Sequence, residues 1–134
     1  MAARIVPEGG WGSRLKPERT PRVQKRSHLD FIKTLPCVCC ATKGVLSMAD
    51  DPMHIRIGSQ FHGKEETGGG QKSDDRWTLP GCRKHHEQQH AMGSEKNFWL
   101  MYRLDPFLLA LVLWGLSGDD HAAVKVIRLH ARGG

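Results

Sequence analysis

Residues 37–40 read Cys-Val-Cys-Cys, and residues 80–90 read Pro-Gly-Cys-Arg-Lys-His-His-Glu-Gln-Gln-His. Two residues separate Cys37 from Cys40, and two separate Cys82 from His85. This spacing is typical of a knuckle turn, in which both side chains converge on one tetrahedral ion while backbone amides point at the thiolates. The sequence therefore predicts a structural Zn²⁺ site with four ligands, Cys37, Cys40, Cys82 and His85.

Other interpretations of the cysteines stay open. Cys39 is interpreted as a small packed residue, with ligation in place of Cys37 or Cys40 as the alternative. A redox dithiol would sit at a helix N-terminus within a βαβ pattern, which this sequence lacks. Disulfides are not expected, because no apolar stretch typical of a signal peptide follows the first basic residue, and the protein is expected in the reducing cytoplasm.

A second group of potential ligands overlaps the first. His86 and His90 are four residues apart on a predicted helix, so they share one face and can bind a single ion. His85 is rotated by about 100° from His86, as expected if it binds a different ion. Three groups upstream favour a second metal site further: His54, Asp74 and Asp75.

Periodicity and breaker residues predict a small α+β domain. Strands are expected at residues 51–57 and 76–80, with a hairpin arm at 44–49 and a glycine-rich loop at 58–75. A short amphipathic segment is expected at 28–35, and helices are expected at 81–91, 95–103, 105–116 and 120–130. Ser94, Asp105 and Asp119 are predicted N-caps. The longest apolar run, residues 107–116, is about half of a membrane span, so no membrane association is expected.

The charge distribution indicates a polyanionic partner. The 134 residues carry a formal net charge of +6, and residues 1–33 contain eight basic and three acidic side chains. An extended basic arm without apolar periodicity favours nucleic acid, and a merely solubilising tail is the alternative. At this length one domain is expected, which excludes Rossmann and TIM-barrel enzymes.

The combination of motifs resembles the HNH endonucleases, whose fold is the ββα-metal motif, in their zinc-stapled form. The resemblance covers residues 35–100 and includes the C-x-x-C pair, the strand with His54-Ile55-Arg56, the loop ending in Lys72-Ser73-Asp74-Asp75 and the segment 80–90. It is strongest for the phage and prophage group, which includes recombination-associated nucleases. The resemblance implies a DNA substrate, phage or recombination proteins as partners, and a bacterial or phage-encoded protein.

By motif position, the resemblance makes His54 the general base that activates water. His86 and His90 become ligands of the catalytic cation, Mg²⁺ or another divalent ion. An imidazole suits the first role because it titrates near neutral pH, and a divalent cation suits phosphate chemistry because it neutralises developing charge. Arg56 and Lys72 flank this site and could contact phosphate, with solvated charges as the alternative.

The sequence departs from the HNH pattern at two places. Met53 occupies the position of a third metal ligand, and a thioether binds hard cations poorly. The third ligand is therefore expected from Asp51, Asp74, Asp75 or water. The asparagine that orients the base also has no counterpart, and Asp75, or else Asp74, is the candidate for that role. These departures leave loss of catalysis as an alternative.

The expected protein is a ββα-metal domain with a zinc knuckle, C-terminal helices and a basic N-terminal arm. The arm is expected at residues 1–27, the nuclease-like domain at 28–103 and the helical extension, which could also form a homodimer face, at 104–134. The expected function is metal-dependent hydrolysis of DNA phosphodiester bonds. The alternative is a zinc-stapled DNA-binding or adaptor protein with a degenerate site. The residues expected to bind nucleic acid are Arg22, Lys25, Arg26, Arg56 and Lys72.

Overall fold

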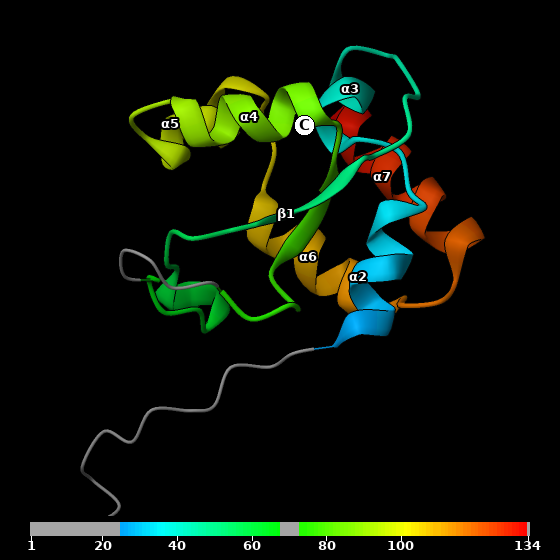
Figure 1. The fold of residues 1–134 in the computed structure, drawn as a ribbon, viewed down its shortest axis with the longest axis horizontal. Coiled ribbons are helices and arrows are strands. Elements are labelled where there is room, and N and C mark those ends of the chain that lie inside the picture. The colour runs from blue at the N-terminus through cyan, green and yellow to red at the C-terminus, as the bar shows by residue number, and fades with distance from the viewer. Residues whose placement is uncertain (1–24, 68–72, 134) are drawn as a thin grey trace, which may run out of the picture.

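A computed structural model describes residues 25–67 and 73–133 as a mixed α+β fold (Figure 1). This confirms the predicted class. Arg22, Lys72 and most of the predicted arm lie outside the described residues. The elements follow in the order α2 (Arg26–Lys33), α3 (Val38–Thr42), β1 (Asp51–His54), the 3₁₀ turn η2 (Gln60–His62), β2 (Thr78–Gly81), α4 (Arg83–Ala91), α5 (Glu95–Met101), α6 (Pro106–Gly115) and α7 (Asp120–Gly133).

The centre of the fold is an antiparallel pair of short strands. β1 pairs with β2 in a register that sets Asp51 opposite Gly81 and His54 opposite Thr78. Met53 is fully buried, and a Cβ added at Gly81 would lie 2.4 Å from its sulfur atom. Gly81 is therefore required by packing, because only a residue without a side chain leaves room for Met53.

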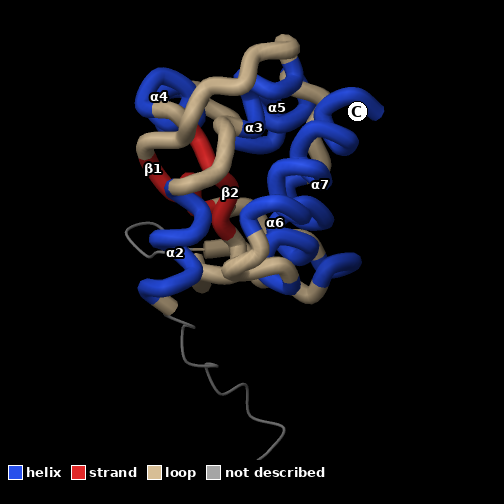
Figure 2. The backbone as a smooth tube through the Cα atoms, turned by 90° about the vertical axis from the view of Figure 1, so that its right-hand side faces the viewer, coloured by secondary structure: helices blue, strands red, loops and turns tan. Residues whose placement is uncertain are grey.

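Helices enclose this hairpin. In Figure 2 the strands lie between α4 above and α2 below, with α6 and α7 on their right. α2 packs on both strands, α6 packs on β2, and α7 packs on α3 and α6. The fully buried side chains include Trp99 and Phe98 of α5, Ile32 of α2 and Leu79 of β2, so all layers share one core.

The predicted helix starts are confirmed by their caps. The Ser94 hydroxyl accepts from the Asn97 amide at 3.2 Å, and the Asp105 carboxylate accepts from the Leu108 amide at 3.1 Å. Asp119 accepts from the amide of Ala122 at 3.1 Å in the same way at α7. Each bond satisfies one donor that a helix leaves unpaired, at about 1 kcal/mol per cap.

The structure corrects three predictions. β1 ends at His54 and not at residue 57, because the Arg56 amide donates to the Glu95 carboxylate at 3.2 Å instead of continuing the sheet. Residues 44–49 form no hairpin arm; a single bridge joins Pro36 and Met48. Residues 76 and 77 precede β2 as a turn and do not belong to the strand.

His28 is buried, although a histidine without a ligand-spaced partner in the sequence is expected on the surface. Its side chain is fully buried on the inner face of α2, where Nδ1 lies 2.9 Å from the Ser117 hydroxyl and the ring meets Trp114 edge-on. Within the described residues no single helix is long and apolar enough to cross a membrane, and α5 with α6 reaches that length only as a pair bent by 82°.

Candidate metal centres and active site

Four ligand atoms converge where α3 meets the start of α4. Nδ1 of His85 lies 3.1 Å from the sulfur of Cys82 and 3.5 Å from those of Cys37 and Cys40, and all four ligand atoms lie within 4.8 Å of one another. A tetrahedral Zn²⁺ with S and N ligands needs separations of about 3.5 to 3.8 Å between them. The Cys40 amide also points at the Cys37 sulfur, 3.4 Å away, as a knuckle requires. These residues could therefore hold a metal ion such as zinc.

The thiols of this cluster differ in how readily they ionise. The pKa of Cys37 is lowered to about 4, chiefly by a hydrogen bond from the Cys39 thiol. Burial and the neighbouring Cys37 charge raise the pKa of Cys40 to about 12. A thiolate at Cys37 thus disfavours ionisation of the Cys40 thiol. Several thiolates can coexist here only beside a cation. Cys39 is fully buried and is not among the four converging groups, in accord with a packing role.

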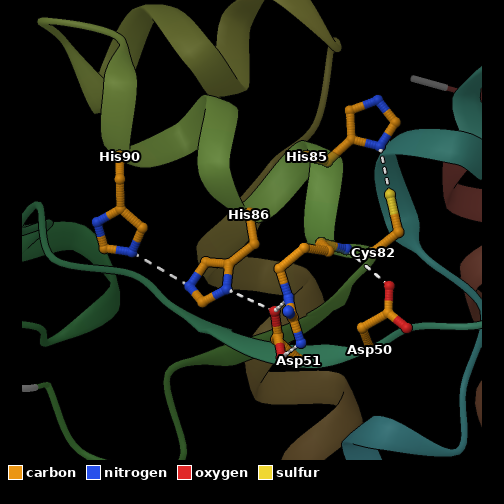
Figure 3. Close-up of polar contacts among 7 residues, drawn as sticks. Asp50, Asp51, Cys82, His85, His86 and His90 are labelled. Carbon is orange, nitrogen blue, oxygen red and sulfur yellow. Dashed lines mark hydrogen bonds and ion pairs between the residues drawn. The ribbon is translucent and has the colours of Figure 1, made fainter.

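The second pair of histidines points away from this cluster. Figure 3 shows His86 and His90 turned toward each other and His85 turned to the other side of α4. The two Nε2 atoms are 3.1 Å apart. Ligands in neighbouring positions around an octahedral ion at about 2.1 Å are about 3 Å apart, so the pair fits two sites of one divalent cation.

Asp51 contacts the opposite nitrogen of His86. Its Oδ2 lies 3.0 Å from His86 Nδ1 and accepts from Arg83 Nε at 2.9 Å (Figure 3 draws the contact to His86). The hydrogen bond from Arg83 lowers the pKa of Asp51, so the carboxylate stays charged. This arrangement fixes the His86 ring with Nε2 toward His90, which is the way that outer carboxylates orient metal-binding histidines. Direct ligation by Asp51 stays a prediction.

A third contact joins the predicted base to a carboxylate. His54 Nε2 lies 3.1 Å from Oδ1 of Asp75, which is almost fully buried. The other oxygen of Asp75 accepts from the Lys25 amide at 2.7 Å. Asp74 contacts Arg76 instead, at 3.0 Å. Of the two aspartates considered for orienting His54, Asp75 is therefore the one that contacts its ring.

Helix α4 connects these groups. Gln89, between His86 and His90 in sequence, donates to the carbonyl of His54 at 3.1 Å. Among the described residues, three or more ligand groups come together only in the Cys3His cluster. Within this part of the chain, His54, His86 and His90 therefore do not meet as one ligand set.

The basic residues predicted to contact nucleic acid lie on two segments. Lys25 and Arg26 are exposed at the start of α2, where the Lys25 amide contacts Asp75. Arg26 pairs with Asp30 at 3.4 Å on the surface. Arg56 is half-buried just beyond β1, two residues after His54.

Two contacts were not predicted from the sequence. Asp50 accepts from the Arg83 amide at 2.8 Å and so caps α4, next to the candidate metal ligand Cys82. Arg83 pairs with Asp51 and holds it beside His86. The signal that could have revealed both is the pair of adjacent aspartates where the first strand begins.

Residues 3–100 match the family described as "Protein of unknown function (DUF968)". The chain belongs to this DUF968 family. Over 77 residues it is 40% identical to "Uncharacterized protein YdfU" of Escherichia coli (strain K12), which covers 58% of this chain and 19% of the relative. The chain thus spans about a fifth of the length of that relative. No solved structure matches the chain. The family match contains both candidate metal centres and ends before α6.

Proposed function

We propose that this DUF968 protein is a metal-dependent endonuclease of the HNH type that hydrolyses DNA phosphodiester bonds. The observation that carries the proposal is the contact between His54 and Asp75 at the end of β1, together with the His86–His90 pair on the helix that follows β2. The order strand, strand, helix and the placement of one imidazole on a strand and two on the helix support the proposal, because the resemblance to HNH endonucleases implies this arrangement.

His54 supplies the base in this mechanism. Its contact with the Asp75 carboxylate assigns the proton to Nε2, so Nδ1 carries the lone pair that takes a proton from water. Asp75 is buried and anchored by the Lys25 amide, so it holds the ring in one orientation and stabilises the imidazolium that forms. Oriented general bases of this kind contribute about 10²–10⁴-fold to rate.

His86 and His90 would hold the cation, with Asp51 orienting His86 through Nδ1. A divalent cation bound there would neutralise charge on the scissile phosphate and on the leaving 3′ oxygen. Met53 cannot complete this site, because its side chain is fully buried against Gly81. Water and phosphate oxygens are the remaining ligands, which suits Mg²⁺ because this ion usually keeps several waters.

The test is cleavage of supercoiled plasmid by the zinc-loaded protein with added Mg²⁺ or Mn²⁺. His54→Ala should lower the single-turnover rate by about 10²–10⁴-fold while zinc content and DNA affinity hold. His121→Ala is the matched control, since His121 is exposed on α7 and should leave the rate unchanged. Equal rates for the wild type and His54→Ala would reject the proposed site.

The second candidate is a zinc-stapled DNA-binding or adaptor protein without catalysis. It is favoured by one observation: among the described residues no third ligand group joins His86 and His90. The two candidates differ in the cation dependence of cleavage. DNA binding without cleavage at any Mg²⁺ or Mn²⁺ concentration would support the second.

A further inference from the structure

The turn after β1 presents one aromatic side chain to solvent. Phe61 of η2 is 91% exposed, the highest value among the large exposed apolar side chains of the described residues. Its neighbours in the turn, Gln60 and Gly63, add no apolar surface. A protein interface needs a contiguous patch of many residues, whereas a single ring offers one surface of the size of a nucleobase.

The turn that carries Phe61 is fixed by its own hydrogen bonds. The backbones of Ser59 and Lys64 bond to each other twice, at 2.8 and 2.9 Å, and the Ser59 hydroxyl lies 2.7 Å from Nδ1 of His62. Gly63 closes the turn with a φ of 73°, which favours glycine. Phe61 is therefore held in place although it is exposed, so stacking on it costs little ordering entropy.

A series of aromatic contacts anchors the turn to the core. The Phe61 ring meets the His62 ring edge-on at 5.0 Å, and His62 stacks on Phe107 at 5.2 Å. Phe107 in turn meets the buried Trp77 at 6.2 Å. With 91% of its surface exposed, the Phe61 ring stays accessible to a planar ligand despite this contact.

The charge near the turn disfavours the phosphate backbone of a nucleic acid but not an uncharged base. Glu65 and Glu66 are exposed four and five residues after Phe61, and their charges disfavour a phosphate backbone lying along this segment. A base that has left its stack carries no charge and can reach the ring. Phe61 is the seventh residue after His54, so the Cα atoms of the two residues lie at most about 25 Å apart.

We infer that Phe61 is a stacking site for an unpaired nucleobase, and that the substrate class is single-stranded or locally unpaired DNA. This inference rests on the proposed function for its placement beside a cleavage site. Stacking on an aromatic ring is sequence-tolerant, so the site would select for strand state and not for sequence.

The test measures binding of a fluorescent thymidine oligonucleotide of about 16 nucleotides and of a duplex of equal length, in the His54→Ala background that prevents cleavage. Phe61→Ala should weaken single-strand binding by about 5- to 100-fold and leave duplex binding within about twofold. Phe61→Trp should keep the affinity and add fluorescence quenching on single-strand binding. Leu129→Ala, another exposed apolar residue, is the control and should change neither affinity.

Unchanged single-strand affinity in Phe61→Ala, or equal losses for single strand and duplex, would overturn the inference. If Phe61→Ala loses only single-strand binding but the protein with His54 intact does not cut DNA with Mg²⁺, the stacking site stands and the nuclease proposal fails. If the intact protein cuts DNA and Phe61→Ala binds single strands normally, only the stacking site fails. Absence of all DNA binding would reject both.

Discussion

At the residue scale, the two ring nitrogens of His86 have different neighbours, Asp51 on one side and His90 on the other. A carboxylate on Nδ1 makes the imidazole a better ligand through Nε2 and holds it in one orientation. In the proposed site, Nε2 of His86 would bind the cation and Asp51 would hold the ring in position through Nδ1.

This division predicts different responses to metal concentration. His90→Ala and Asp51→Asn should both weaken Mn²⁺ binding, by about 10- to 100-fold for Asp51→Asn, and added metal should recover part of the cleavage rate. His54→Ala should not be recovered. Asp30→Asn, a surface change on α2, is the control. The measurement is the single-turnover cleavage rate of each variant as a function of Mn²⁺ concentration. If added Mn²⁺ recovers the rate of His54→Ala and of no other variant, the assigned roles are reversed.

The buried His28 gives a second prediction at this scale. Burial, and then the charge of Lys25, lower the pKa of His28 from 6.5 to about 4. The unfolded chain thus binds a proton between pH 6.5 and 4 that the folded chain does not, so stability falls as pH falls through this window. Between pH 7.5 and 5 the loss from this group should be about 2 kcal/mol.

His28→Gln removes the titration and keeps a polar group for Ser117. The free energy of unfolding of the wild type, measured with urea, should decrease by about 2 kcal/mol more between pH 7.5 and 5 than that of His28→Gln. Both proteins share all other titrating groups, so the difference reports His28. Parallel pH dependences would show that His28 is protonated in the folded protein as readily as in the unfolded chain.

At the scale of elements, the zinc knuckle joins α3 to the start of α4. Cys37 is the N-cap of α3 and Cys82 is the N-cap of α4, so one ion would fix the starts of both helices. Because α3 has only five residues, it is too short to be stable alone. Metal binding is therefore coupled to folding of this part of the protein.

Zinc removal or Cys40→Ser should unfold the domain and not merely inactivate it. Cys39→Ala is the matched control, since Cys39 is buried next to the cluster but is not one of its converging groups. It should keep stoichiometric zinc. Circular dichroism and metal analysis of the purified proteins test this. Folded Cys40→Ser protein without zinc would contradict it.

Local signals explain which elements could be predicted from the sequence. The caps Ser94 and Asp105 act within three residues, and the C-x-x-C and C-x-x-H spacings act within one turn, so all of these were predictable. The end of β1 depends on Glu95, about forty residues away, and no local pattern contains that contact. Helix α3 overlaps the cysteine motif, and the spacing of the cysteines predicts metal ligands but no helix.

In the candidate site, too, arrangements within one element are predictable from the sequence and contacts between elements are not. His86 and His90 share a helix face by spacing alone, but the choice of Asp75 over Asp74 for His54 depends on how the loop enters β2. The burial of His28 depends on its contact with Ser117, which is distant in sequence. Spacing predicts groups within one element, and tertiary packing decides the partners between elements.

At the scale of the whole molecule, the charge of the chain is concentrated at one end. Five basic and two acidic side chains fall in residues 1–24, and Lys25 and Arg26 follow at the start of α2. Lys25 has a separate structural role, because its amide anchors Asp75. A deletion that tests the basic segment should therefore stop at residue 24, so that the contact to the proposed catalytic pair is kept.

Deletion of residues 1–24 should weaken DNA binding for all sequences and reduce its dependence on salt. Each lost phosphate contact lowers the slope of log affinity against log salt by about 0.9, so five basic residues allow a reduction of at most about 4.5. Affinities at several salt concentrations measure this slope. Arg26→Gln in the full chain is the control for one charge outside the deleted segment, with an expected change of at most about 0.9. An unchanged slope after the deletion would mean that residues 1–24 do not contact phosphates, and DNA affinity would then come from charges in residues 25–134.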